Sequence, residues 1–294
     1  MYPIKDLWEP GSLDEAVDML KAHPEAMVLA GGTDLFIKLR EGHWDEASFV
    51  SLQKLDELRR IDYLPEGDVF VGALATFAQI GKDPLIEKHF PLLKKAALSM
   101  GGPQVRNMAT LGGNICNGAV SADGAPSMFA LDARLVLKGA DSDRVVPITD
   151  FYEGPGKVRI LPGEILTGFI LKELPGYGGE YIKFATRKAM DISMLGCAAV
   201  CGVGPDSKIT DLRIALGTAA PVPVRCTEAE QMAKGRMLDP VLLDEIAQQA
   251  VLAANPRTSW RASMEYRQIV IKELAERAVL TAYRKAGGRY DEEN

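Results

Sequence analysis

The sequence predicts a protein of mixed helices and strands in two domains. Its 294 residues exceed the usual length of a single domain. Strand-like and helix-like segments alternate up to about residue 171, whereas residues 181–216 read as strands joined by turns, which is typical of an antiparallel sheet, and three helical segments follow. Prolines and glycines cluster at Pro175–Gly179, so this segment is the best candidate for a linker between the two parts.

Composition and charge exclude several classes of protein. The chain is 47% hydrophobic and 25% charged, which is ordinary for a globular protein. Its net charge of −6 argues against a general nucleic-acid binder. The most apolar run, residues 194–204, is about half the length that a membrane-spanning helix needs, and the N-terminus lacks the pattern of a secretory signal. We therefore expect a cytoplasmic protein that binds neither nucleic acid nor membrane.

The cysteines and histidines indicate no metal site in this chain. Four cysteines stand at positions 116, 197, 201 and 226, and no pair has the CxxC spacing of zinc or iron–sulfur ligands. Three scattered histidines form no metal-type pair. Free cysteines are typical of a reducing compartment. Cys197 and Cys201 lie in an apolar strand, where we expect small buried side chains rather than reactive ones.

Helix starts and periodic apolar residues predict the individual elements. Capping boxes at Ser12–Glu15 and Thr76–Gln79 each predict a helix start. The stretch 107–122 is uncharged, rich in Gly and Asn, and too irregular for a clean helix. The expected helices are 13–22, 35–40, 84–98, 126–131, a helix capped by Thr227 with Glu230, a helix opened by Asp239-Pro240, and 263–286. The expected strands are 26–30, 49–52, 69–73, 135–138, 145–148, 165–171, 181–184, 197–203 and 212–216.

Two glycine-rich turns are the candidate ligand site. The first, Ala30-Gly31-Gly32-Thr33-Asp34, joins a strand to a helix start, and the second is Thr110-Leu111-Gly112-Gly113-Asn114. Glycine lets the backbone approach a ligand closely, and a helix start offers free N–H donors, an arrangement that favours phosphate. An ordinary strand-to-helix turn explains the first equally well. Asp123 follows the second turn, where its carboxylate suits a ribose hydroxyl or a helix N-cap.

Known nucleotide and catalytic motifs are absent. The sequence has no GxxxxGK[ST], no GxGxxG after the first strand, no GxSxG and no HExxH. No acid, base or nucleophile accompanies the two turns, so we predict no catalytic residue here. This pattern suits a redox cofactor that brings its own chemistry and that the protein only binds and tunes.

The two turns carry a resemblance to a known family. Leu29–Asp34, together with Ala109–Ile115 and Asp123, closely resembles the FAD-binding subunits of molybdenum hydroxylases. The similarity covers essentially the whole chain, including Gly102–Asn107 and Ser259–Ala262. Within the family, the segments Gly113–Gly118, Ser121–Asp123 and Ala189–Ser193 look most like bacterial xanthine dehydrogenase.

The resemblance implies an α+β fold. A vanillyl-alcohol-oxidase-type FAD-binding domain would cover residues 1–175, with lobes at about 1–55 and 56–175. A C-terminal domain of the CO dehydrogenase flavoprotein type, an antiparallel sheet packed with helices, would cover 176–294. Non-covalent FAD would lie between the lobes and against the second domain, and the two glycine turns would hold its pyrophosphate from opposite sides.

The resemblance also implies a set of cofactor contacts. The matching positions are Met27, Val28, Leu29, Ala30, Gly31, Gly32, Thr33 and Asp34 around the diphosphate; Met100, Gly101, Val105, Ala109 and Thr110 along the flavin path; Gly113, Asn114 and Cys116 beside the diphosphate and ribityl chain; Asp123 at the adenosine ribose; Ile165 and Leu166 packed on the adenine; and Lys183 at the flavin ring. Residues 185–192 would border the face where NAD binds. Met100 stands where some relatives have a ring-stacking aromatic.

The implied function is electron transfer. A small partner subunit with [2Fe–2S] clusters would pass electrons to FAD in this chain, FAD would pass them to NAD⁺, and a large subunit with the molybdenum cofactor would hydroxylate a purine, xanthine or hypoxanthine. Such a complex is a heterotrimer of purine metabolism. The alternatives are a nicotinate, carbon monoxide or aldehyde dehydrogenase, a stand-alone flavin oxidase, and a nucleotide-binding scaffold without redox function. No cysteine-rich insertion interrupts the chain, which argues against a hydroxybenzoyl-CoA substrate.

Overall fold

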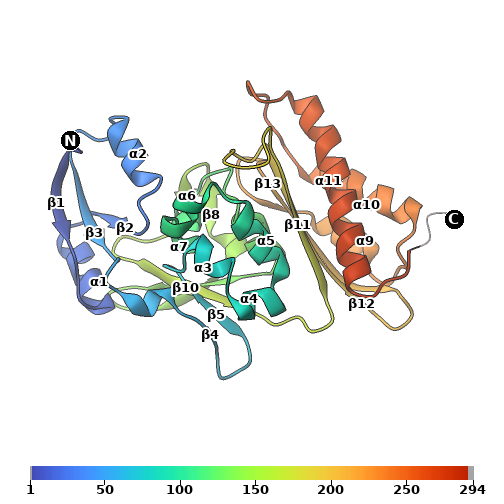
Figure 1. Ribbon diagram of the computed structural model, residues 1–294, viewed down its shortest axis with the longest axis horizontal. Helices are drawn as coiled ribbons and strands as arrows, with labels where there is room; N and C mark the ends of the chain where they lie inside the picture. Colours follow the sequence, from blue (N-terminus) through green and yellow to red (C-terminus); the bar gives the residue numbers. More distant parts are fainter. Residues whose placement is uncertain (1, 291–294) are drawn as a thin grey trace.

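Three main β-sheets organise the chain, and the computed structural model describes residues 2–290 of it (Figure 1). The first sheet is parallel, with strand order β1-β3-β2. Its strands are β1 (Ile4–Trp8), β2 (Met27–Leu29) and β3 (Ala47–Ser51). Parallel neighbours need crossover connections, which α1 (Leu13–Ala22) and α2 (Leu35–Arg40) supply. Both helices are confirmed as predicted, whereas β1 was not predicted.

The second sheet is antiparallel, and its central strand comes from later in the sequence than the other four. Its order is β4-β5-β10-β6-β7. The strands are β4 (Ile61–Tyr63), β5 (Val69–Gly72), β6 (Arg134–Lys138), β7 (Arg144–Pro147) and β10 (Ile165–Leu171). The central strand β10 pairs with β5 on one side and β6 on the other, so it joins two hairpins into one sheet. A small hairpin of β8 (Tyr152–Gly154) and β9 (Lys157–Val158) follows η2 (Ile148–Asp150).

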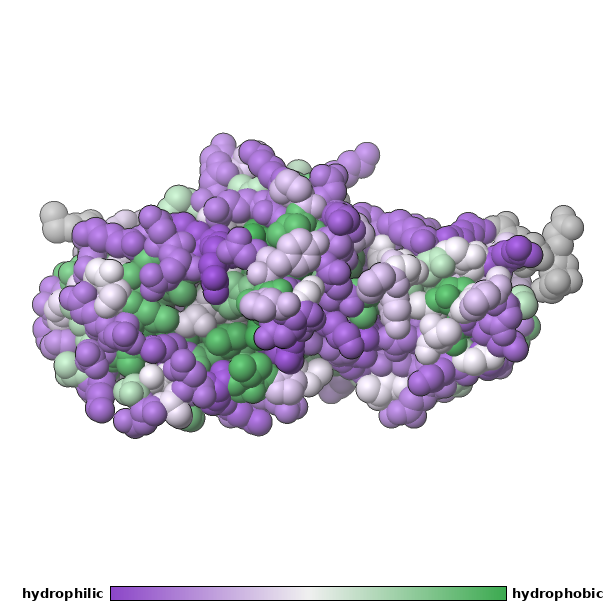
Figure 2. All heavy atoms as spheres, turned by 90° about the horizontal axis from the view of Figure 1, so that it is seen from below, coloured by the Kyte–Doolittle hydropathy of each residue, from purple (hydrophilic) through white to green (hydrophobic). Residues whose placement is uncertain are grey.

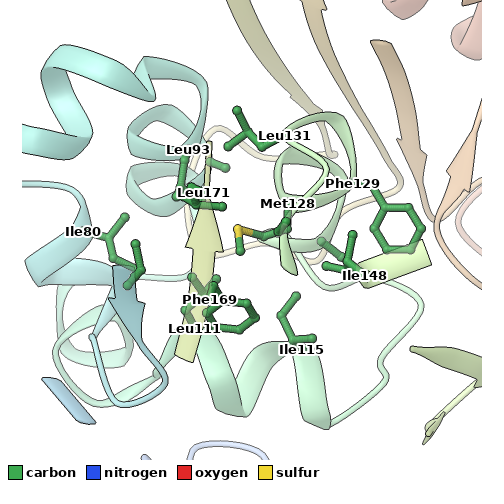
Figure 3. Close-up of a cluster of buried hydrophobic side chains, with 14 of the residues drawn as sticks. Ile80, Leu93, Leu111, Ile115, Met128, Phe129, Leu131, Ile148, Phe169 and Leu171 are labelled. Atoms are coloured by element: carbon green, nitrogen blue, oxygen red, sulfur yellow. The ribbon is translucent and has the colours of Figure 1, made fainter. Parts of the chain in front are cut away.

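Short helices pack on this sheet around the largest hydrophobic cluster of the described chain (Figure 3). They are α3 (Phe77–Ile80), α4 (Pro84–His89), α5 (Pro91–Ser99), α6 (Pro103–Met108), α7 (Leu111–Cys116) and α8 (Ala125–Ala130), with the 3-10 turn η1 (Asp56–Arg59) before β4. Figure 3 shows Leu111 and Ile115 of α7 beside Phe169 of β10 and Met128 of α8. These four side chains are fully buried, so the helix after the second glycine turn is fixed by packing.

Two predictions in this region are wrong. The expected helix 84–98 is divided at Phe90, whose φ of −134° is not helical, because Pro91 has no N–H and disfavours a helical residue before it. The stretch 107–122, expected to be irregular, contains α7. Thr110 caps this helix by accepting the N–H of Gly113 at 3.1 Å, which offsets the low helix propensity of its glycines.

The third sheet is antiparallel, as predicted, and lies between helices of both parts of the chain (Figure 1). Its order is β11 (Gly178–Phe184), β12 (Leu195–Val203), β13 (Ile209–Gly217) and β14 (Val224–Arg225). On one side lie α9 (Thr227–Ala233), α10 (Pro240–Ala253) and the long α11 (Met264–Lys285). On the other side α5 and α8 of the N-terminal part contact β11 and β12.

Two further expectations for the C-terminal part need correction. Strand β11 begins at Gly178, inside the expected linker, because a Cβ at Gly178 would lie 1.9 Å from the carbonyl oxygen of Ala282 and only glycine lets the strand meet α11 there. Thr227 does not cap α9, whose N-cap is Cys226. The carboxylate of Glu230 instead binds the Arg225 guanidinium and the N–H of Ile214, both at 2.8 Å.

Partly buried ion pairs attach the third sheet to the N-terminal part. Glu180 of β11 is 5% exposed and accepts Nζ of Lys285 at 2.8 Å and Nζ of Lys95 from α5. Arg213 of β13 reaches Asp132, which follows α8, at 3.0 Å. These contacts fix the third sheet against the helices that carry the candidate site.

The surface seen from below is mainly hydrophilic, with hydrophobic side chains lying among polar ones (Figure 2). Within residues 2–290, no helix has both the length and the apolar composition required to cross a bilayer.

Truncation of the central strand should reveal its importance for stability. Phe169 of β10 is 0% exposed, so we expect Phe169→Ala to lower the free energy of unfolding by about 3–5 kcal/mol through lost burial and the cavity left behind. Urea unfolding followed by circular dichroism measures this change. Val145→Ala on the edge strand β7 of the same sheet, where the residue is 52% exposed, is the control and should change stability by about 0.5 kcal/mol or less.

Candidate functional site

The two glycine turns lie side by side. A Cβ at Gly31 would lie 2.0 Å from the carbonyl oxygen of Met108, a distance that no side chain tolerates. A Cβ at Gly113 would lie 3.8 Å from Cβ of Ala30. The first turn therefore packs its backbone directly on the segment that leads into the second, as expected for two turns that serve one ligand.

The second turn is fixed to the edge of the antiparallel sheet. The N–H of Gly112 donates to the carbonyl oxygen of Ala73 at 2.9 Å, and that of Leu111 donates to Ala75 at 3.0 Å. A Cβ at Gly112 would lie 2.7 Å from Cβ of Ala73, so this glycine is required by packing. Gly113 lies on the more open side of the turn. Within the described chain, a Cβ added there would have only two neighbours within 4 Å, Oγ1 of Thr110, which caps α7, and Cβ of Ala30.

The first turn has backbone donors to offer. Gly32 has a φ of +70°, the left-handed region that favours glycine. Within residues 2–290 the N–H groups of Gly32 and Thr33 donate to no acceptor, and both residues are half-buried. The carbonyl group of Ala30 accepts the amide of Gln53, whose side-chain oxygen accepts the Arg59 guanidinium at 2.9 Å. The turn thus keeps two partly exposed donors unused, which fits an anionic group such as a pyrophosphate.

A further hydrogen bond joins the helices that follow the two turns. Nζ of Lys38 in α2 donates to Oδ1 of Asn117 at the end of α7 at 2.7 Å. Oδ1 of Asn114 accepts the N–H of Gly124 at 3.2 Å, which ties the second turn to the loop that carries Asp123. The side-chain oxygen of Asn114 is therefore used within the protein.

Asp123 lies in a buried polar cluster supplied by the third sheet. Its Oδ2 accepts Nζ of Lys183 at 2.8 Å, and its Oδ1 accepts the hydroxyl of Ser193 at 2.7 Å and that of Tyr181 at 3.4 Å. The side chains of Asp123 and Lys183 are 8% and 11% exposed. Nζ of Lys183 also donates to the carbonyl oxygen of Ser99 at 3.2 Å, so it bridges both parts of the chain.

Burial dominates the ionisation of this cluster. Burial raises the pKa of Asp123 above its ordinary value, although the Lys183 ammonium and the hydroxyls of Ser193 and Tyr181 oppose the shift. Burial, and then the nearby Asp123 carboxylate, raise the pKa of the Tyr181 hydroxyl well above its ordinary value, so this hydroxyl stays protonated and donates. The cluster is therefore a buried ion pair in which burial disfavours the ionised form of the Asp123 carboxyl group.

Asp123 and Lys183 were expected at different parts of the cofactor, Asp123 at the adenosine ribose and Lys183 at the flavin ring. The structure brings the two side chains together in one ion pair. Their contacts with the cofactor stay predictions. Asp123 is also not a helix N-cap, since Gly124 has that position in α8.

Ile165 and Leu166 lie deep in the structure. The two residues are 1% and 4% exposed and belong to two different hydrophobic clusters. Their packing on an adenine ring stays a prediction.

The remaining expected positions line the region between the second and third sheets. Met100 is 8% exposed, and its carbonyl oxygen accepts Arg106 at 2.9 Å. Gly101 has a φ of +46° and packs on Val105, which is 37% exposed. A Cβ at Gly102 would lie 3.2 Å from the side chain of Met190, so the loop 101–105 meets the loop between β11 and β12.

The thiol of Cys116 is neutral at ordinary pH. Burial raises its pKa to about 12, so it is no thiolate nucleophile. Cys197, Cys201 and Cys226 are buried as well. Within the described range 2–290, no three or more His, Cys, Asp or Glu side chains are grouped to hold a metal ion.

Sequence reasoning missed the partners of the expected ligands. Ser193, Tyr181 and Ser99 complete the Asp123–Lys183 cluster, and Gln53 with Arg59 fixes the first turn. The family-like segment Ala189–Ser193 contained a signal for Ser193, but no local pattern marks the others, because each contact joins elements that are distant in sequence.

Comparison with known proteins identifies the family. Residues 3–171 match the family "FAD binding domain in molybdopterin dehydrogenase", and residues 180–282 match "CO dehydrogenase flavoprotein C-terminal domain". The chain belongs to the family of FAD-binding medium subunits of molybdenum hydroxylases. It is thus an oxidoreductase subunit with the α+β fold expected for that family.

Individual relatives span nearly the same length. The chain is 39% identical to the xanthine dehydrogenase FAD-binding subunit of Escherichia coli O157:H7, over 98% of this chain and 99% of the relative. It is 33% identical to the nicotinate dehydrogenase FAD-subunit of Eubacterium barkeri, over 79% and 80% of the two chains. The solved carbon monoxide dehydrogenase of Hydrogenophaga pseudoflava superposes with a TM-score of 0.93 at 26% identity, over 97% and 99% of the chains.

A methyl group added at Gly31 should push the first turn away from the Met108 backbone. In Gly31→Ala the new Cβ collides with the Met108 backbone, so we expect a loss of about 1–3 kcal/mol in unfolding free energy and a lower ratio of FAD to protein. Thermal unfolding and the flavin absorbance of purified protein measure the two effects. Gly154→Ala, where nothing lies within 4 Å of the new Cβ, is the matched control. Equal behaviour of the two variants would contradict the tight contact.

Removing the ammonium of Lys183 should make stability depend on pH. In Lys183→Met the buried Asp123 loses the largest effect that lowers its pKa, so the pKa rises further. The folded state then holds a proton that the unfolded state releases, and the variant loses stability relative to wild type as pH rises from about 4 to 7, approaching about 3–5 kcal/mol. Urea unfolding at several pH values tests this. Lys208→Met, which breaks an exposed pair with Asp206, should show a small deficit with little pH dependence.

Proposed function

We propose that this chain binds FAD between its two glycine turns and the third sheet, and passes electrons from [2Fe–2S] clusters of a small partner subunit through FAD to NAD⁺. The observation that carries the proposal is the close backbone contact of Gly31 in the first turn with Met108, which ends α6 just before the second turn. We propose that the unused N–H groups of Gly32 and Thr33 and the open side of Gly113 together form a cradle for a pyrophosphate.

We predict no acid, base or nucleophile beside the two turns, so we assign the redox chemistry to the cofactor and only its binding to this chain. FAD, when bound, accepts electrons singly and releases them as a pair, so the chain need only hold, orient and shield it. We propose a FAD-binding domain at residues 1–175, with lobes at about 1–55 and 56–175, and a C-terminal domain at 176–294. The side chains of Met27, Val28 and Leu29 pack in the hydrophobic clusters of the first lobe. They therefore support the first turn from inside the protein.

Lys183 supplies fixed positive charge at one end of the cradle. Its Nζ donates to Asp123 and to the carbonyl oxygen of Ser99, which leaves one of its three N–H bonds for a cofactor oxygen. A cation at this place stabilises negative charge that develops on a bound ring. Ser193 and Tyr181 keep the Asp123 carboxylate oriented, and the carboxylate in turn fixes the ammonium.

The substrate of the complex is proposed from similarity. The chain is more similar over a greater length to a xanthine dehydrogenase FAD-binding subunit than to a nicotinate dehydrogenase FAD-subunit. We therefore propose purine oxidation, of xanthine or hypoxanthine, by a large partner subunit with the molybdenum cofactor, in a cytoplasmic heterotrimer. Nicotinate, carbon monoxide and aldehyde dehydrogenases are the alternatives within the family, and the partner's substrate separates them.

The bound cofactor and its oxidant can be tested together. We expect the purified protein to absorb near roughly 370 and 450 nm, as flavoproteins do, and anaerobic NADH to bleach the 450 nm band. Xanthine should bleach the same band only when the partner subunits are present, because we propose that the large subunit oxidises the substrate. A protein that is isolated without flavin and takes up none on titration would sink the proposal. Flavin that NADH leaves oxidised would refute the NAD part alone.

A further inference from the structure

A tryptophan stands almost fully exposed on a rigid turn between α10 and α11. Trp260 is 86% exposed, although large apolar side chains are usually at least partly buried. The turn that carries it is closed by hydrogen bonds from the N–H of Ser259 to the carbonyl oxygen of Ala262 at 3.0 Å and from the N–H of Ala262 back to Ser259 at 3.2 Å. The guanidinium of Arg261 lies 4.2 Å from the centre of the indole ring and covers one face.

Three guanidinium groups gather at this turn without a carboxylate partner. Arg257 is exposed and Arg261 half-buried, while Arg267 is 3% exposed. Arg267 donates to the carbonyl oxygen of Met194 and, at 3.1 Å, to Oγ of Ser259, but within residues 2–290 its Nε has no acceptor. None of the three forms an ion pair in that part of the chain. Burial, and then the charges of Arg257 and Arg261, lower the pKa of Arg267.

The basic turn lies at the same end of the third sheet as Lys183. Figure 1 shows the chain entering α11 near the connection between β11 and β12. The ring of Tyr266 in α11 lies 6.3 Å from that of Phe184, the residue after Lys183. Tyr266 is 47% exposed and Ile269, on the next turn of α11, is 68% exposed. Apolar and basic groups thus adjoin the end of β11 that carries Lys183.

We propose that Arg257, Trp260, Arg261, Tyr266 and Ile269 form a docking surface for an acidic face of the iron–sulfur partner subunit. This inference rests on the proposed function. The partner would place carboxylates against the guanidinium groups and an apolar recess over Trp260. Trp and Arg dominate the binding energy of protein interfaces, and a turn that is already ordered loses little entropy on binding.

Other occupants fit this surface less well. A small ligand binds in a concave site, whereas Trp260 projects into solvent. A second copy of this chain in a two-fold dimer would bring the same arginines face to face, and like charges repel. The net charge of −6 disfavours nucleic acid. A protein face of opposite charge remains, and the partner that must approach the FAD site closely is the electron donor.

The experiment titrates the purified iron–sulfur subunit into the FAD-loaded chain. We expect Trp260→Ala to weaken binding by about 30-fold, as for an interface residue worth about 2 kcal/mol. Arg257→Glu combined with Arg261→Glu should weaken it at least as much, with the larger loss at low salt. Circular dichroism and the ratio of FAD to protein should match wild type. Leu252→Ala in α10, where the side chain is 75% exposed, is the control and should bind normally.

The outcomes separate this inference from the proposed function. Unchanged affinity of both surface variants would overturn the docking surface, as would a loss of self-association or of FAD in place of a loss of partner binding. A wild-type chain that takes up no FAD would instead contradict the proposed function itself.

Discussion

The close approach of the Gly31 backbone to the Met108 carbonyl group determines the geometry of the rest of the site. It brings the turn that follows β2 of the parallel sheet against the end of α6, at a contact where a single methyl group would not fit. Around that contact, Gly112 packs on Ala73 and Lys38 reaches Asn117, so the two turns have one relative position. A ligand that binds between them meets donors already in place, which reduces the entropy lost on binding.

Electrostatics joins this N-terminal assembly to the third sheet. The Asp123–Lys183 pair and the Glu180 cluster both cross from one to the other; the first is buried on both sides, and the second has a buried carboxylate with half-exposed lysines. Buried pairs add little net stability, because desolvation offsets their attraction, but they tolerate few alternative arrangements. Their contribution here is to specify the orientation of the third sheet and, with it, the position of the Lys183 ammonium.

Local signals predicted most elements and marked the two glycine turns, whereas the family resemblance was needed to predict the individual cofactor contacts. The capping box at Ser12 and the Asp239-Pro240 start gave α1 and α10 correctly, since caps act within one turn of the chain. The helix α7 was missed because Gly112 and Gly113 disfavour a helix locally, and its burial against β10 is a tertiary contact that the Thr110 cap alone does not reveal. Ser193 and Tyr181 were missed for the same reason: their partner Asp123 is brought to them by tertiary packing alone.

The late position of β10 has a consequence for how the chain is made. The ribosome releases β4, β5, β6 and β7 as two hairpins that share no edge until residues 165–171 emerge to pair with both. Until then the helices of the nascent segment have no complete sheet to cover, and their apolar faces stay accessible to chaperones or to aggregation. The first, parallel lobe has no such dependence, because all of its strands emerge before residue 52.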